Sequence, residues 1–258
     1  MDKQRYVYTV KDNDKMFDLL DILARATGHM TVPVLAKRLK VPKTRVLRLL
    51  DILQARQLVM HDDVTGECQL GYGAYVLSQS ILNSNSLLKL AHPVMEDLAR
   101  KLDEAIYITV MSDDEVLFLD MVDSLQRIKT APMVGYRFPF FTNAAGKAIT
   151  AMSAMEIVER KGRRWWNKKE IKDLDKLLLE LQEIRQRGVA IEAGGLGQDI
   201  CSVAVAVRDY AGKVIGALTM LAPTFRMVQD RLEQEIIPAM QYAAELLSMK
   251  FGYVKASA

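Results

Sequence analysis

The sequence predicts an α+β protein with two parts: three helices and a β-hairpin first, then a larger antiparallel sheet with flanking helices. Two observations predict this fold class. Between residues 13 and 57, apolar residues recur at helical spacing in three successive segments, and a hairpin-like pattern follows. Between residues 105 and 222, segments rich in Ile, Val, Tyr and Phe are joined by short polar turns, which favours antiparallel neighbours.

The composition is that of a folded protein without a membrane-spanning segment. Half of the 258 residues are hydrophobic, so a sizeable core can be buried. The two cysteines, Cys68 and Cys201, lie far apart, which fits neither a disulfide framework nor a metal site and favours a reducing compartment. No apolar run approaches about 18 residues, and the N-terminus lacks the apolar core of a signal peptide. We therefore expect a soluble cytoplasmic protein with no cofactor.

Residues 31–57 have the pattern of a helix–turn–helix. Thr31 is a helix-start residue and Pro33 is tolerated in a first turn, so a short helix is expected to end near Leu39. The residue before Pro42 is pushed out of the helical region, and Pro42 suits the opening turn of a second helix. The second helix has one apolar stripe at spacings of three, four and seven. The stripe consists of Val46, Leu49, Leu50 and Leu53.

The opposite face of this second helix is basic over its first two turns. Between Thr31 and Leu50 there are six basic residues and no Asp or Glu, and the first acid is Asp51. A recognition helix presents such a polar N-terminal part to the DNA major groove. The alternative is the solvated basic face of an ordinary surface helix. The expected DNA-binding residues are Lys37, Arg38, Lys43, Thr44, Arg45 and Arg48, with Lys37 and Arg38 on phosphate.

A helix over 13–27 precedes this pair, and two short strands around a Gly-containing turn follow it over 58–71. Three helices and a hairpin form a winged helix–turn–helix, which we assign to residues 1–72. An amphipathic segment over 73–90 is interpreted as a linking helix that also packs against a second copy of the chain. An ordinary helix packed on its own chain is the alternative. Residues 91–258 form the second domain.

The second domain is expected to have helices on an antiparallel sheet, the layout of a small-molecule sensing domain. The expected strands are 105–112, 115–123, 126–133, 201–208 and 213–222. A small-residue stretch over 142–148 opens a helix, and another helix covers 92–102. A capping box of Asn167 and Glu170 is expected to begin a long helix that ends at Arg187. A closing helix over 227–250 is expected to be interrupted or kinked at Pro238.

No catalytic constellation is found. The three histidines, His29, His61 and His92, do not lie at motif spacing from a cysteine, serine or acidic cluster. The helix start at Gly146 and Lys147 lacks the glycine spacing of a phosphate loop. An enzyme with a DNA-binding appendage would need an acid–base–nucleophile set, which is missing. We expect neither an enzyme nor a metal protein.

Five sequence stretches, taken in order and spacing, resemble the IclR family of bacterial transcriptional regulators over nearly the whole chain. They are VPKTRVLRLLDIL at 41–53, QLG at 69–71, FPFFTNAAGKAITA at 138–151, IRQRG at 184–188 and SVAVAVRDYAGKVIGAL at 202–218. Thr44 and Arg48 match the family's Ser/Thr followed four residues later by Arg.

The resemblance implies a winged-helix domain joined by a helix to a GAF-like effector domain in a dimer or tetramer. By position it implies an effector site made of Thr142, Asn143, Ala144, Gly194, Gly195, Cys201, Ser202, Thr219 and Leu221. Thr, Asn and Ser offer hydrogen bonds, and the helix N-terminus at 144–146 can hold an anionic group. An organic or aromatic acid would suit such a site.

Four positions depart from the family pattern. Members often carry two acidic residues where this chain has Ala-Gly-Gly at 193–195, and small residues there are expected to open space. The frequent cysteine position is Ser202, with Cys201 one residue earlier. Gln57 stands where glycine is common, and Cys68 stands where an aromatic residue is usual.

The sequence therefore predicts a ligand-responsive transcriptional regulator that binds a (pseudo)palindromic operator in double-stranded DNA as a homodimer or homotetramer. Its two recognition helices would read half-sites about one DNA turn apart. The alternative is a DNA-binding protein whose second domain only oligomerises and binds no ligand. Repression and activation both remain open.

Overall fold

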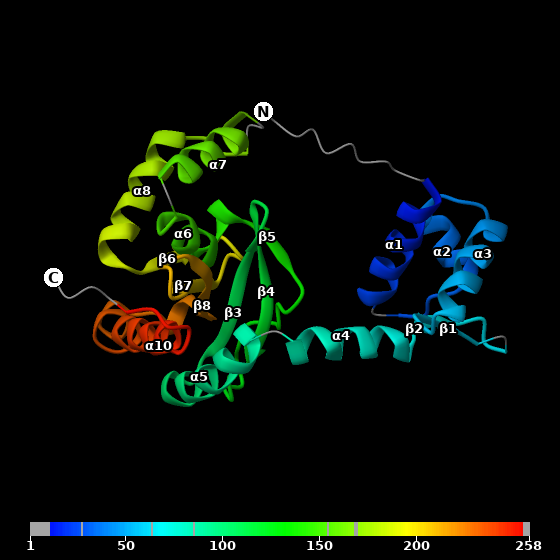
Figure 1. Ribbon diagram of the computed structural model, residues 1–258, viewed down its shortest axis with the longest axis horizontal. Helices are drawn as coiled ribbons and strands as arrows, with labels where there is room; N and C mark the ends of the chain where they lie inside the picture. Colours follow the sequence, from blue (N-terminus) through cyan, green and yellow to red (C-terminus); the bar gives the residue numbers. More distant parts are fainter. Residues whose placement is uncertain are drawn as a thin grey trace. The chain divides into compact units, whose positions relative to one another are not determined.

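The computed structural model describes residues 11–26, 28–62, 64–84, 86–153, 155–167 and 170–254 (Figure 1). The chain divides into two compact units, Met1–Asn85 and Ser86–Ala258. The expected linking helix over 73–90 corresponds to α4 and the first residues of α5, which belong to different units. No described helix has the length and apolar character that crossing a bilayer requires.

The first unit has three helices, a two-stranded hairpin and a fourth helix, as expected. Its elements are α1 Lys11–Ala24, α2 Val32–Leu39, α3 Lys43–Ala55, β1 Val59–His61, β2 Cys68–Leu70 and α4 Tyr72–Ser84. All four residues of the predicted α3 stripe are buried, and they pack with Leu19 and Leu35 in one core. The turn before α3 forms because Lys40 adopts a left-handed conformation and Pro42 precedes the first helical residue.

The hairpin is tied to the segment before α2. Its register pairs Val59 with Leu70 and His61 with Cys68. Thr31 forms an isolated antiparallel bridge with Glu67, and the Cys68 amide donates to the Met30 carbonyl at 2.6 Å. Cys68 is buried in the core at the position where the family pattern has an aromatic residue.

The second unit is a six-stranded sheet in the order β5-β4-β3-β8-β7-β6, with every neighbouring pair antiparallel. The strands are β3 Ala105–Ser112, β4 Glu115–Val122, β5 Arg137–Pro139, β6 Ala190–Ala193, β7 Ile200–Arg208 and β8 Val214–Pro223. The helices are α5 Ser86–Leu102, α6 Ala144–Ala151, α7 Met155–Asn167, α8 Leu174–Arg187, α9 Gln229–Arg231 and α10 Ile237–Lys250.

Helices cover both faces of this sheet (Figure 1). One face packs on α5 and α10, and the other on α6 and α8. Successive strand residues point to opposite faces, so β8 sends Leu218 and Met220 toward α5 and α10. Leu221 packs in the core on the α6 side, and Thr219 points to the same face by this alternation.

The predicted strand over 126–133 is wrong. This segment forms no ladder, and the third strand beside β4 is the short β5 after it. Polar bonds to other parts of the unit hold the segment instead. The Gln126 side chain donates to Asp103, and Arg226 donates to the Ile128 carbonyl at 2.7 Å. Pro132 has no amide hydrogen to donate to a ladder.

The predicted start of the long helix at Asn167 is also wrong. Asn167 is the last residue of α7, and α8 begins at Leu174. Asp173 is the N-cap of α8 because its carboxylate accepts from the Lys176 amide at 3.0 Å. The end of α8 is as predicted, with Gly188 in the left-handed conformation.

Three further boundaries differ from the expectation. Helix α5 begins at Ser86 and contains Pro93, so its start lies before the predicted 92. The short edge strand β6 was not predicted. The closing helix is interrupted by a π-helical turn over Leu232–Ile236, and Pro238 lies in the first turn of α10.

Candidate DNA-binding face and effector site

The predicted DNA-binding residues lie on α2 and α3. Lys37, Arg38, Lys43, Thr44 and Arg48 are exposed, and Arg45 is half-buried. Lys43 and Thr44 begin α3, and Arg48 follows one turn later, with no acidic residue in the first turn. The polar start of α3 is therefore open to a DNA groove, while its apolar stripe anchors the helix in the core.

Arg38 has a different neighbourhood from Lys37. It lines a hollow of about 400 Å³ between α1 and α2, and two acids of α1, Asp18 and Asp21, line the same hollow. Two further basic residues line the hollow as well, so its acids do not outnumber its basic residues, and Arg38 stays a candidate for a DNA phosphate.

Two exposed apolar residues of α3, Leu47 and Ile52, were not singled out from the sequence. Their side chains are 42% and 48% exposed although they belong to the helix that the unit is packed around. Leu47 lies one turn after Thr44 and next to Arg48, whereas Ile52 lies beyond Asp51. Their positions off the apolar stripe are the sequence signal that distinguishes them from core residues.

The start of α6 is bonded to the protein itself. The Asn143 side chain is fully buried, accepts from the Gly146 amide at 2.9 Å and donates to the Pro139 carbonyl at 3.1 Å. The Ala144 amide donates to the Ser202 hydroxyl at 3.2 Å. An anion at this N-terminus would have to displace these side chains, so the expected anion position at 144–146 is closed in this structure.

Several predicted effector residues share the sheet face under α6. Ser202 pairs with Leu221 across β7 and β8, and Thr219 pairs with Tyr107 of β3. The Thr219 hydroxyl lies 3.1 Å from that of Thr109. The structure therefore brings Ser202, Thr219 and Leu221 together with the start of α6.

Tyr107 and Thr130 were missed by the sequence reasoning. Both hydroxyls are buried and close to one another, and neither has a hydrogen bond of normal geometry within the described residues. Burial is the main cause that raises the pKa of Tyr107. An alternating strand with a tyrosine on the covered face is too common a pattern to identify such a residue in advance.

Cys201 does not join this group. Successive residues of β7 alternate, so Cys201 points to the face of Val203, opposite to Ser202. Burial, and then the nearby charge of Glu192, raise the pKa of its thiol to about 11. The one-residue shift between Cys201 and the family's cysteine position therefore moves the thiol to the other side of the sheet.

The two glycines after β6 differ in their surroundings. A Cβ at Gly194 would meet nothing within 4 Å, and its φ of 85° is left-handed. A Cβ at Gly195 would overlap the carbonyl oxygen of Thr142. The expected open space therefore exists at Gly194. At Gly195 the lack of a side chain allows the backbone to lie close to that of Thr142.

Lys147 is held by two carboxylates. Its buried ammonium donates to Glu180 of α8 at 2.6 Å and also to Glu192 of β6. These contacts tie α6 to α8 and to the edge strand β6, so Lys147 has a structural role in this unit. Within the described residues, no three His, Cys, Asp or Glu side chains form a metal-binding group.

Two family models match the chain. The IclR helix-turn-helix domain matches residues 14–63, and the bacterial transcriptional regulator IclR C-terminal domain matches residues 79–249. The second match covers more than half of the chain. Together the two matches leave out β2, the first part of α4 and the outermost residues of α1 and α10.

Known proteins of similar sequence and structure agree. The HTH-type transcriptional repressor AllR of Salmonella paratyphi A is 25% identical over 217 residues, 83% of this chain and 80% of that protein. The Thermotoga maritima IclR structure has a TM-score of 0.79 at 20% identity and covers 95% of this chain and 100% of its own.

An IclR homologue from Microbacterium hydrocarbonoxydans, solved in complex with 4-hydroxybenzoate, is also similar. It has a TM-score of 0.77 at 19% identity and covers 93% of this chain and 99% of its own. At these identities the two structures support the fold. The domain matches and the AllR relatives establish that the chain belongs to the IclR family of transcriptional regulators, which are not enzymes.

Proposed function

We propose that the protein is a ligand-responsive regulator that binds a (pseudo)palindromic operator as a homodimer or homotetramer in the cytoplasm. The observation that carries this proposal is the exposed, acid-free start of α3, held in place by its buried stripe. In this proposal, residues 1–72 form the DNA-binding domain and residues 91–258 form the effector-binding domain. Residues 73–90 link the two domains and form a dimer contact.

The proposed DNA contacts follow from position and chemistry. Lys43, Thr44, Arg45 and Arg48 share base-edge and phosphate contacts, and Arg48 has the planar fork that suits a guanine edge. Lys37 and Arg38, the two basic residues in the last turn of α2, contact phosphate.

The proposed dimer contact is the apolar face of α4. Tyr72, Tyr75, Val76 and Leu77 are all more than half exposed. Tyr72 and Tyr75 also line an apolar hollow of about 550 Å³ with Leu70. A second copy packed on this face would pair two recognition helices for half-sites about 34–36 Å apart.

The proposed effector is an organic or aromatic acid bound on the sheet face under α6. The 4-hydroxybenzoate complex of the Microbacterium homologue supports an aromatic acid, and the name of the AllR relatives supports repression. The proposed site keeps the residues expected from the sequence except Cys201, which points to the opposite face of the sheet, with Ser202 and Thr219 as hydrogen-bonding groups. Tyr107 and Thr130 add two buried hydroxyls that a polar ligand group can satisfy.

One observation favours the alternative that the second unit only oligomerises. Ser202 and Asn143 already bond the α6 start, and Gly195 lies against Thr142. A site filled by its own side chains needs a rearrangement before it can accept a ligand.

Two measurements on the full-length protein test the proposal. An operator is first selected from random duplex DNA, and Arg48→Ala is then expected to weaken binding by about 1–3 kcal/mol in a gel-shift assay. Arg56→Ala, an exposed arginine after α3, is the matched control and should bind as the wild type does. Unchanged affinity of Arg48→Ala would refute the role assigned to Arg48.

The effector is tested by thermal unfolding with aromatic and aliphatic carboxylic acids, 4-hydroxybenzoate among them. A ligand that binds the folded state raises the unfolding temperature progressively with its concentration, and it is expected to change operator affinity. If one class of acid stabilises the protein and alters operator binding, the sensor is supported. If no acid does either while operator binding persists, two options are left: a neutral or bulkier effector, or the oligomerising alternative.

A further inference from the structure

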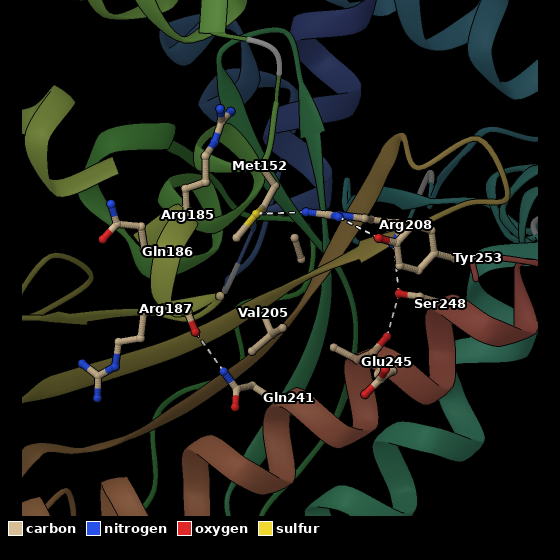
Figure 2. A pocket seen from close by; sticks show the side chains of 13 residues that line it. Met152, Arg185, Gln186, Arg187, Val205, Arg208, Gln241, Glu245, Ser248 and Tyr253 are labelled. Atoms are coloured by element: carbon tan, nitrogen blue, oxygen red, sulfur yellow. Dashed lines mark hydrogen bonds between the residues drawn. The ribbon is translucent and has the colours of Figure 1, made fainter. Parts of the chain in front are cut away.

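A further hollow lies in the second unit, away from the sheet face under α6. It has a volume of about 430 Å³ and opens between the C-terminal ends of α6 and α8, the end of β7, and α10 (Figure 2). Met152, Arg185, Arg208, Gln241, Glu245 and Tyr253 are among its lining residues. Its volume is in the range of small-ligand sites.

Arg208 is the central polar group of this hollow. Its guanidinium is half-buried between Met152 and Tyr253, as Figure 2 shows. It donates to the Tyr253 hydroxyl at 2.9 Å and to the Met152 sulfur at 3.1 Å, and it lies 5.5 Å from the centre of the Tyr253 ring. The Arg208 amide donates to the Ser248 hydroxyl at 3.0 Å, which fixes the backbone.

The partners of Arg208 are neutral, and no carboxylate of the described residues lies within ion-pair distance of it. A guanidinium carries five N–H donors, and the bonds to Tyr253 and Met152 use only a part of them. A half-buried cation that neutral groups hold in one orientation is suited to a carboxylate or phosphate, which it can bind through two parallel hydrogen bonds.

The other charges around the hollow leave it positive. Arg185 donates to the carbonyls of Ala151, at 2.6 Å, and of Ser153, so its role is to bond the C-terminal end of α6. Arg187 pairs with Glu233. The lining acid is Glu245, which is exposed and makes no ion pair with Arg208. The bonds to free carbonyls at a helix end explain the presence of Arg185. They do not explain Arg208, which is the last residue of β7.

We propose that this hollow binds a small organic anion through a carboxylate or phosphate group held by Arg208, with the Tyr253 hydroxyl as a second donor. Apolar walls from Val205 and Ala244 would contact the remainder of the ligand. The site is separate from the proposed effector site. Helix α6 begins at that site and ends beside this hollow, and β7 runs from Ser202 to Arg208.

The test uses the full-length protein with two probes, inorganic phosphate and succinate, added at constant ionic strength against chloride. Binding is measured by isothermal titration calorimetry and by the rise in unfolding temperature. The wild type is expected to show saturable binding of one probe or both, and the preferred probe identifies the anionic group. Arg208→Gln should weaken that binding by about tenfold or more, because it removes a charged hydrogen bond.

Three variants make the result decisive. Arg208→Lys keeps the charge and should retain part of the affinity, and Glu245→Gln removes the lining acid and should strengthen binding. Arg100→Gln, an exposed arginine of α5, is the matched control and should equal the wild type. Circular dichroism checks that Arg208→Gln is folded; if it is not, the Glu245→Gln result decides.

The proposal is overturned if neither probe binds the wild type, or if folded Arg208→Gln binds as tightly as the wild type. It is also overturned if Glu245→Gln leaves the affinity unchanged. None of these outcomes depends on operator binding. The Arg208→Gln and Glu245→Gln comparisons separate binding in this hollow from binding of succinate at the effector site proposed under α6.

Discussion

The backbone of Gly195 lies directly against the carbonyl oxygen of Thr142, so that a Cβ at Gly195 would overlap it. This contact joins the turn after β6 to the segment that leads into α6. Neither residue is near the other in sequence, so the pairing is a property of the folded sheet. It brings together two predicted effector residues by backbone contact rather than around an open space.

Replacing Gly195 with alanine should therefore destabilise the second unit. The added methyl group meets backbone, which cannot rotate away as a side chain can, and overpacking of this kind costs about 1–3 kcal/mol. Gly194→Ala is the comparison. Its added methyl group lies in open space, so the only expected cost is that of the left-handed φ, about 1 kcal/mol. Urea unfolding followed by circular dichroism measures both, and equal losses would contradict the close contact.

Replacing Gln57 with glycine should stabilise the first unit. Gln57 has a φ of 56°, in the left-handed region where a side chain costs about 1–2 kcal/mol. Glycine relieves that cost but loses more entropy on folding, so the expected gain is about 0.5–1 kcal/mol. Gln54→Gly, inside α3, is the matched control and should lose about 1 kcal/mol. A lower unfolding temperature for Gln57→Gly would refute the prediction.

The sequence predicted the parts of the fold that depend on local periodicity. The α3 stripe and the boundaries of β3 follow from side-chain spacing alone, and Gly188 ends α8 because it accepts a left-handed conformation. It failed where bonds between distant residues decide the structure. Residues 126–133 have strand-like composition, but bonds to Asp103 and from Arg226 hold them in an irregular path.

The proposed effector site shows the same difference between local and long-range interactions. Asn143 is predictable as a helix cap because the cap is a local interaction, and its bond to Gly146 is present. The bond from Ala144 to Ser202 spans two distant segments and depends on the placement of α6 on β7. The side to which Cys201 points depends on the register of β7, which a sequence pattern of consecutive small apolar residues leaves undefined.

The thiol of Cys201 should be unreactive in the folded protein at pH 8. Its pKa is raised from 9.0 to about 11, mainly by burial, so the reactive thiolate is scarce. The folded state favours the protonated thiol, so the stability that this group contributes is present below pH 9 and is lost as the pH rises toward 11. Cys68→Ser isolates the thiol. Alkylation by iodoacetamide should be about a hundredfold slower in the folded than in the urea-unfolded protein.

Leu47 should contact the methyl group of a thymine in the operator. It is exposed between Thr44 and Arg48, on the side of α3 that is proposed to face DNA, and it is not part of the core of the first unit. Apolar side chains read thymine through its 5-methyl group. The thymines of the selected operator are replaced by uracil one at a time, and each replacement removes only the methyl group. Replacement of the thymine that Leu47 contacts should weaken wild-type binding by about 0.8 kcal/mol, roughly fourfold.

A double-mutant cycle tests this contact. In Leu47→Ala the same uracil replacement should have no further effect, because the side chain that contacts the methyl group is gone. Ile52→Ala is the matched control: Ile52 is equally exposed on α3 but lies beyond Asp51, so its uracil response should equal that of the wild type. If no thymine position distinguishes the wild type from Leu47→Ala while both bind the operator, Leu47 does not read a base, although α3 remains the DNA-binding helix.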